Sequence, residues 1–256
     1  MTADPSDTGL PVQAVGRTFD IINHLRTEGA SGVTAVADGL ALPKSTVHGY
    51  LDSLERGGYV VRDDGEYRLS LQFLDLGDYA RSRYGLYETV KPEVDDLVAE
   101  LGERAQVMVE EAGQGVYIYQ TTGENAIQTD SHIGTTVNLH TTAVGKAYLA
   151  FQPEERRESF IDGELAQVTE RSLVDTDALR EELAEVREQG YAFNMEEKLD
   201  GMRAVGAPIL DDDGVSTAAI SVSGPTTRFN GSFLTDDLPQ RMSQVAKVVS
   251  VKTAYS

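Results

Sequence analysis

The 256-residue chain contains no cysteine, which removes several kinds of chemistry from consideration. Without a thiol there is no disulfide, no thiolate metal ligand and no cysteine nucleophile. No run of about 18 apolar residues is present either, so the sequence predicts no transmembrane helix and no membrane partner. Residues 1–9 contain neither a basic nor an apolar signal region, and this favours a cytoplasmic protein.

Positive charge is also scarce, with 22 Lys and Arg against 42 Asp and Glu and a net charge of −20. Residues 1–83 hold 8 of the bases and 12 of the acids, whereas residues 84–256 hold 14 and 30. Nucleic-acid binders are normally basic, because Lys and Arg displace counterions from phosphates. The chain is therefore either an acidic protein that does not meet DNA or a protein of a halophilic host, where molar salt screens charges within about 3 Å. We favour the halophilic source.

The length favours two domains, and the first has the pattern of a winged helix-turn-helix. Three amphipathic helices are predicted, then two short strands that turn at Asp64-Gly65, a common hairpin dipeptide. Pro43 suits the first turn of the third helix, and Gly57-Gly58 ends it. After a disordered segment 1–11, the sequence thus predicts a winged helix-turn-helix over residues 12–70. The three helices are expected at residues 12–27, 33–41 and 44–56.

The remaining chain predicts a linking helix over residues 71–84 and an α+β domain over residues 85–256. In the linking helix, Leu71, Leu74 and Tyr79 are candidates for contact with a second subunit. The larger domain combines helical periodicity with alternating strand patterns, which indicates helices flanking an antiparallel sheet, as in sensor domains. Its helices are expected at residues 86–101, 141–151, 176–189 and 234–250. Strands are expected at residues 105–112, 115–123, 203–210 and 215–224, with further strand-like pieces in 126–139.

The third predicted helix presents a polar face opposite its core residues Val47, Leu51 and Leu54. Small and donor-bearing groups at the start of a helix suit the major groove of DNA, and the helix N-terminus suits phosphates. An ordinary solvated helix face is the alternative, but the order of three helices and a wing favours DNA binding. The polar face consists of Lys44, Ser45, Thr46, His48 and Gly49.

The chain resembles the IclR family of bacterial and archaeal regulators over residues 12–250. The matching segments in the first domain are VQAVGRTFDII, LPKSTVHGYLDSLERGGYV and the wing residues Tyr67-Arg68-Leu69. In the second domain they are LHTTAVGKAYLA, GYAFNMEE, RAVGAPILDDDG and AISVSGPTTRF. The resemblance implies a winged helix-turn-helix, a GAF-like effector-binding domain, and homodimers that can pair into tetramers on double-stranded DNA.

The recognition helix departs from the family at Gly49, where many members have Arg after the His. Asp52 and Glu55 are also unfavourable near phosphates. DNA affinity is then expected to depend on the remaining polar face and on basic residues of the first helix and the wing. The predicted DNA-binding residues are Arg17, Lys44, Ser45, Thr46, His48, Gly49, Arg62 and Arg68.

Ser221 and Ser223 are two apart on a predicted strand, so their hydroxyls point to one face. Buried hydroxyls need partners, either a ligand or, alternatively, the protein backbone. The family's sensor pocket is lined by this Ser pair, by an acid near the Glu pair and by a Cys after Gly-x-Arg; the last two positions are Asn194 and Ala204 here. The resemblance thus implies an effector pocket formed by Ile133, Leu139, Ala143, Val144, Asn194, Ala204, Ser221 and Ser223.

Structural roles are favoured for three further candidates. Lys146 suggests a Schiff base or a phosphate contact, but no phosphate-binding loop precedes it, so an ion pair or an exposed Lys is preferred. His132 and His140 with Asp130 lack a metal-ligand spacing. Glu196 and Glu197 are neighbours on a predicted strand and face opposite ways, so they form no acid/base pair. We predict no catalytic residue, metal or cofactor.

The favoured function is sequence-specific DNA binding modulated by a small effector, an organic acid or another catabolite. Two alternatives remain at this point. An enzyme built on the sensor-like domain would need a catalytic dyad that the sequence does not offer. A regulator that has lost its ligand response would fit the changed residues Asn194 and Ala204.

Overall fold

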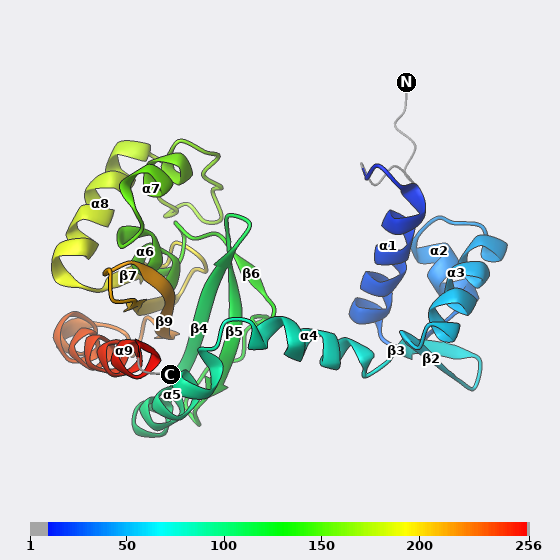
Figure 1. The fold of residues 1–256 in the computed structure, drawn as a ribbon, viewed down its shortest axis with the longest axis horizontal. Helices are drawn as coiled ribbons and strands as arrows, with labels where there is room; N and C mark the ends of the chain where they lie inside the picture. Colours follow the sequence, from blue (N-terminus) through cyan, green and yellow to red (C-terminus); the bar gives the residue numbers. More distant parts are fainter. Residues whose placement is uncertain (1–9, 255–256) are drawn as a thin grey trace. The chain divides into compact units, whose positions relative to one another are not determined.

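The computed structural model describes residues 10–254, so most of the segment predicted to be disordered lies outside the described residues. The chain divides into two compact units, Met1–Arg83 and Tyr84–Ser256 (Figure 1). Within residues 10–254, none of the helices combines the length and apolar character that a bilayer crossing requires.

The first unit packs three helices against a small antiparallel sheet of order β1-β3-β2. Its core contains Ile21, Val36, Val47 and Leu51, all buried. Asp64 and Gly65 both have positive φ, 47° and 85°, as the tight hairpin turn predicted between the wing strands requires. The two-residue strand β1 was not predicted. The elements are α1 Gln13–Glu28, β1 Ser31–Gly32, α2 Val33–Gly39, α3 Lys44–Arg56, β2 Val60–Asp63, β3 Glu66–Leu69 and α4 Gln72–Ser82.

The second unit is built on a six-stranded antiparallel sheet of order β6-β5-β4-β9-β8-β7, which confirms the predicted α+β class. Only Thr136–Val137 forms a strand in the region 126–139; the rest of that region is loop. Helix α7 was not predicted, because its charged residues leave little apolar periodicity. The elements are α5 Tyr87–Leu101, β4 Arg104–Glu111, β5 Gln114–Thr122, β6 Thr136–Val137, α6 Ala143–Ala150, α7 Glu154–Ile161, α8 Thr176–Gln189, β7 Ala192–Met195, β8 Met202–Leu210, β9 Ser216–Pro225, the π-helical turn η1 Phe233–Asp237 and α9 Leu238–Ala254.

Helices cover the two faces of this sheet differently (Figure 1). One face packs against α5 and α9 through an apolar layer that includes Val107, Val205 and Ile220. The other face packs against α6 and α8 through Met108 and Ala219, among others. Because side chains alternate along a strand, the residues of the second face that α6 leaves uncovered are free to be polar.

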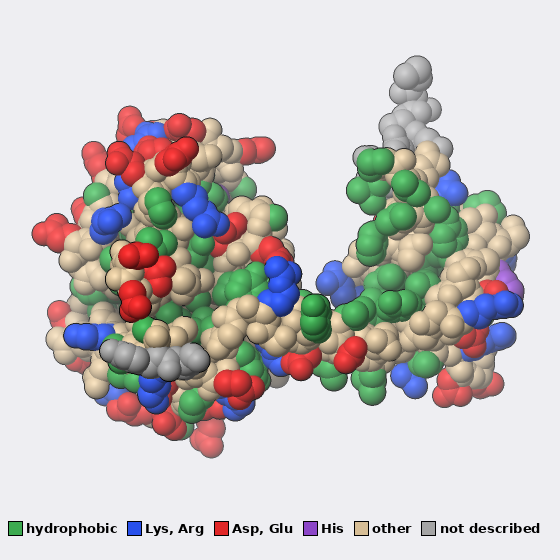
Figure 2. Space-filling view, in the orientation of Figure 1, with side chains coloured by type: hydrophobic (Ala, Val, Ile, Leu, Met, Phe, Trp, Pro, Cys, Tyr) green, Lys and Arg blue, Asp and Glu red, His purple; other side chains and the backbone are tan. Residues whose placement is uncertain are grey.

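Helix α4 buries none of its own residues within the described chain. Leu74 and Tyr79 are 68% and 72% exposed, and Phe19 on α1 is 53% exposed. Hydrophobic side chains accordingly gather along both helices on the face shown in Figure 2. An isolated helix of this length is marginal in water, so such a surface suits contact with another chain.

Candidate functional site

Helix α3 has the two faces that the sequence predicts. Val47, Leu51 and Leu54 are buried against the first unit's core. On the opposite side Lys44, Ser45, His48 and Gly49 are exposed, and Thr46 is half-buried. The helix begins after Pro43, and no side chain caps it, so its first N–H groups stay available for a phosphate.

The other predicted DNA-binding residues differ in accessibility. Arg62 and Arg68 are exposed on the wing strands, and the Arg62 guanidinium lies 5.4 Å from the Tyr67 ring centroid. Arg17 is half-buried on α1, and its Nε has no hydrogen-bond partner among the described residues. The wing arginines are therefore better presented to a ligand than Arg17.

The second unit contains a row of side chains that crosses four strands. Asn194 on β7 pairs with Ala204 on β8, Ala204 with Ser223 on β9, and Ser223 with Arg104 on β4. Directly paired residues of an antiparallel sheet share one face. In the adjacent row Ser221 pairs with both Gly206 and Gln106. Ser221 and Ser223 thus face the same side of the sheet, as predicted from their spacing.

Helix α6 begins directly above this face. Thr142 is its N-cap, and its hydroxyl accepts a hydrogen bond from the Gly145 N–H at 3.1 Å. A Cβ built on Gly206 would lie 2.5 Å from the Ala143 carbonyl and 2.7 Å from the Val144 N. Glycine at 206 therefore lets the helix start approach the sheet. Among the described residues, the N–H groups of Ala143 and Val144 have no hydrogen-bond acceptor.

A cavity of about 280 Å³ lies between this helix start and the sheet face. Six of the predicted effector residues line it: Ala143, Val144, Asn194, Ala204, Ser221 and Ser223. The cavity is lined in full by Arg104, Gln106, Tyr117, Thr129, Asp130, Ser131, Thr142, Ala143, Val144, Val168, Asn194, Lys198, Leu199, Met202, Arg203, Ala204, Ser221 and Ser223.

Two predicted residues do not line the cavity. Leu139 is buried in the apolar layer around α6, because its side chain packs under the helix it precedes. Ile133 is exposed in the loop before β6. The structure therefore does not bring these two side chains to the other six.

The hydroxyls of Ser221 and Ser223 have no hydrogen-bond partner among the described residues, although Ser221 is only 5% exposed. The alternative of serines bonded to the protein backbone is not observed for either residue. Buried hydroxyls in proteins are usually satisfied. The two groups are therefore available to a molecule in the cavity.

Asn194 already uses part of its hydrogen-bonding capacity within the protein. Its Nδ2 already donates to the Thr141 carbonyl, and its Oδ1 accepts from the Glu196 N–H at 3.2 Å. The side chain thus ties β7 to the segment before α6, and one amide hydrogen remains for a ligand.

Three cations that sequence reasoning did not identify also line the cavity: Arg104, Lys198 and Arg203. Arg203 is paired with Glu196, so the other two are the ones considered for a ligand. Arg104 is 6% exposed and Lys198 is half-buried. Burial lowers the pKa of both groups, and it raises the pKa of the neighbouring Tyr117 hydroxyl. The sequence signal that could have indicated Arg104 is its alternation with Gln106, since the two polar residues alternate with apolar ones in an otherwise buried strand.

Lys146 is fully buried inside α6, one turn behind the cavity wall. Its Nζ lies 2.7 and 2.8 Å from the carboxylate oxygens of Glu197, and it also pairs with Glu182 on α8. The predicted ion pair is confirmed, and the alternative of an exposed Lys is wrong. Burial raises the pKa of Glu197, while Lys146 opposes that rise.

Glu196 and Glu197 form no pair, but not because they alternate along a strand. Strand β7 ends at Met195, and Glu196 has a φ of 75°. The Glu196 carboxylate therefore turns toward the Gly201 N–H, at 3.0 Å, while Glu197 turns inward to Lys146. Across residues 10–254 there is no group of three or more side chains suited to a metal ion. His140 is buried and bonds the Ala166 carbonyl at 2.9 Å.

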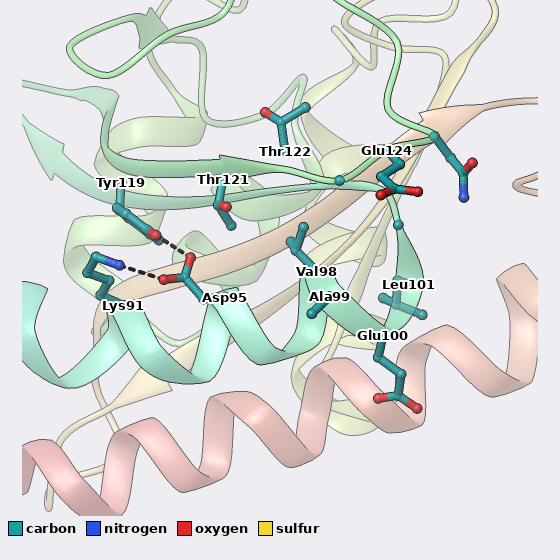
Figure 3. Close-up of a pocket in the computed structure, with 13 residues that line it drawn as sticks. Lys91, Asp95, Val98, Ala99, Glu100, Leu101, Tyr119, Thr121, Thr122 and Glu124 are labelled. Carbon is teal, nitrogen blue, oxygen red and sulfur yellow. Dashed lines mark hydrogen bonds and ion pairs between the residues drawn. The ribbon is translucent and has the colours of Figure 1, made fainter.

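A larger hollow of about 790 Å³ lies between α5 and the end of β5 (Figure 3). Its polar groups are paired with one another: Lys91 lies 2.6 Å from Asp95, which also accepts from the Tyr119 hydroxyl. The hollow also opens toward Glu100 and Glu124. It presents no unpaired cation and is the weaker candidate for a ligand site.

Two family models match the chain. Residues 14–64 match the IclR helix-turn-helix domain, and residues 79–251 match the C-terminal domain of bacterial transcriptional regulators of the IclR type. A probable HTH-type regulator, ArcR of Halobacterium salinarum, is 34% identical over 260 residues, or 98% of each chain. The regulator KdgR of Escherichia coli is 29% identical and covers 95% of this chain and 94% of its own. The Halobacterium match agrees with the halophilic source expected from the charge.

Solved structures share the same fold. The IclR protein of Thermotoga maritima superposes with a TM-score of 0.85 over 94% of this chain and 99% of its own, at 27% identity. An IclR homologue of Microbacterium hydrocarbonoxydans, solved with 4-hydroxybenzoate, has a TM-score of 0.77 at 21% identity and covers 93% of this chain and 100% of its own. These relatives are regulators, and they give no support to the enzyme alternative.

Proposed function

Because the chain belongs to the IclR family of transcriptional regulators, we propose that α3 and the wing bind operator DNA and that a small organic acid in the 280 Å³ cavity modulates this binding. The effector would bind one arrangement of the protein better than another and so shift the population toward it. The observation that carries the proposal is the unsatisfied hydrogen-bonding capacity of this cavity.

That capacity comes from two sides. Ser221 and Ser223 offer two hydroxyls from the sheet, and Ala143 and Val144 offer two N–H groups from the start of α6. A helix N-terminus carries a partial positive charge, so these N–H groups suit the oxygen atoms of a small acid. The apolar part of the wall, which includes Val144, Ala204 and Met202, suits a compact hydrocarbon body beside the acid.

We expect removal of the serine hydroxyls to weaken effector binding. Ser221→Ala and Ser223→Ala should each cost about 1 kcal/mol, the usual value of a neutral hydrogen bond. Asn194→Asp should cost about 1–3 kcal/mol, because it replaces the Nδ2 donor to Thr141 by a charge that repels an anion. The measurement is calorimetric titration of the full chain with small acids, sugars and aromatic compounds, including 4-hydroxybenzoate.

Ser159→Ala is the matched control, since Ser159 is exposed on α7 and should leave binding unchanged. Binding of sugars in place of acids would contradict the effector class. A chain that binds none of these compounds would instead fit the alternative of a lost ligand response.

We expect changes on the polar face of α3 to weaken DNA binding. Thr46→Ala and His48→Ala should each cost about 1–3 kcal/mol per lost base contact and relax sequence preference. The measurement is fluorescence anisotropy with DNA that the protein selects from a random-sequence pool. Thr27→Ala, at an exposed position of α1, is the control. Unchanged affinity and selectivity in both α3 variants would place recognition elsewhere.

The apolar surfaces of α1 and α4 support a homodimer as the DNA-binding form. Leu71, Leu74 and Tyr79 remain largely exposed in the single chain, and α4 buries nothing of its own. A second copy would cover these side chains and bring two α3 helices together for half-sites about 34 Å apart. Pairing of such dimers would give the tetramer that the family resemblance implies.

A further inference from the structure

Arg104 and Lys198, two of the three cations that line the cavity, have only neutral hydrogen-bond partners, whereas the third, Arg203, pairs with Glu196. The Arg104 guanidinium donates to the Ile127 carbonyl at 2.8 Å and to the Thr129 hydroxyl, and its Nε has no partner. Lys198 lies 3.1 Å from the Ser131 hydroxyl and 3.5 Å from the Tyr117 hydroxyl. Among the described residues, no carboxylate lies within ion-pair distance of either cation. A buried charge without a counter-ion is costly.

Asp130, in the loop that these cations hold, is a carboxylate whose charge acts on both of them. Residues 127, 129 and 131 supply three of their four partners, and Asp130 lies among them and also lines the cavity. Its side chain is exposed at the mouth. The negative charge of Asp130 raises the pKa of Arg104 and of Lys198, against the larger lowering by burial. Asp130 therefore acts on both cations through space without closing an ion pair.

We propose that Arg104 and Lys198 form the subsite for the anionic group of the effector and that Asp130 is the counter-ion which this group replaces. The inference rests on the proposed function, that an organic acid binds in the cavity. It assigns the charge recognition to the sheet and the loop, and it leaves the serines and the start of α6 to contact the rest of the ligand.

The number of unused hydrogen-bond donors supports binding of the anionic group by Arg104 and Lys198. A guanidinium has five N–H donors and an ammonium has three, whereas Arg104 uses two and Lys198 two in the described structure. A carboxylate in reach of both would form charge-assisted hydrogen bonds, which are stronger than those of the hydroxyls and carbonyl.

The test is titration of the full chain with small carboxylates, each paired with its neutral primary amide. The panel comprises acetate, propionate, lactate, benzoate and 4-hydroxybenzoate. We expect the affinity for an acid that binds to exceed the affinity for its amide by about tenfold or more. Arg104→Gln and Lys198→Met should each lower the affinity for the acid about tenfold or more and leave the affinity for the amide unchanged. Asp130→Asn should raise the affinity for the acid about threefold.

Lys247→Met and Asp213→Asn change the same charges at exposed positions and should leave acid binding unchanged. If Arg104→Gln fails to fold, Lys198→Met and Asp130→Asn still carry the test, because they lie on a turn and a loop. The anion subsite would be overturned if acids bind Ser221→Ala more weakly than the wild type, but bind Lys198→Met with normal affinity and Asp130→Asn with no higher affinity. A panel in which no acid binds would overturn the proposed function as well.

Discussion

Lys146→Met is expected to lower the free energy of unfolding of the second unit by about 3–5 kcal/mol. Lys146 is 0% exposed, and its ammonium is shared by Glu182 and Glu197. Methionine fills a similar volume but leaves Glu197, itself 6% exposed, as a buried carboxylate without a cation. Breaking a buried pair from one side is far more costly than replacing both partners by neutral groups.

The double variant Lys146→Met with Glu197→Gln should therefore recover part of the loss. Lys247→Met is the control, because Lys247 is exposed on α9 and should change stability by less than about 0.5 kcal/mol. Urea unfolding of the full chain, followed by circular dichroism, gives the transition of the second unit. A loss below about 1 kcal/mol for Lys146→Met, with no recovery in the double variant, would contradict a buried charge cluster behind the cavity.

Gly206→Ala is expected to cost about 1–3 kcal/mol of stability and to weaken effector binding at the same time. The new Cβ would lie 2.5 Å from backbone atoms of Ala143, and backbone cannot rotate away as a long side chain can. The start of α6 must then lift from the sheet, which moves the N–H groups of Ala143 and Val144 away from Ser221.

The control for this substitution is Gly49→Ala, because a Cβ at Gly49 meets nothing within 4 Å. Alanine there should be neutral or slightly stabilising, since alanine favours helix over glycine. Stability is followed by thermal unfolding and binding by calorimetry. If Gly206→Ala changes neither the stability nor the affinity for the effector, the close approach of α6 to β8 does not shape the site.

The parts of the fold with strong periodicity were predictable from the sequence. Val47, Leu51 and Leu54 define the buried face of α3, and Asp64-Gly65 defines the wing turn, because local sterics and burial act through neighbouring residues. The same holds for α8, where Asp175 caps the first turn and Gly190 adopts the left-handed conformation at the end. These signals are local, so a single sequence reveals them.

The cavity was only partly predictable, because its charged residues are brought together by strand pairing. Arg104 lies opposite Ser223 through the register of β4 with β9, and no spacing along the chain reveals this neighbour. Lys198 enters the cavity because Glu196 adopts a positive φ and Glu197 is anchored to Lys146. The hydrogen bond of Asn194 was not predictable either, since a backbone carbonyl 53 residues away accepts its amide hydrogen.

We expect occupancy of the cavity and DNA affinity to be coupled. The most direct measurement is the affinity of the full chain for its selected DNA, with and without saturating acid, in the wild type and in the Ser221→Ala/Ser223→Ala variant. We expect saturating acid to change the DNA affinity of the wild type by about fivefold or more. DNA should change the affinity for the acid by the same factor. In the variant, the acid concentration that gives half of this effect should be higher. An acid that binds the cavity while DNA affinity stays the same would contradict the coupling.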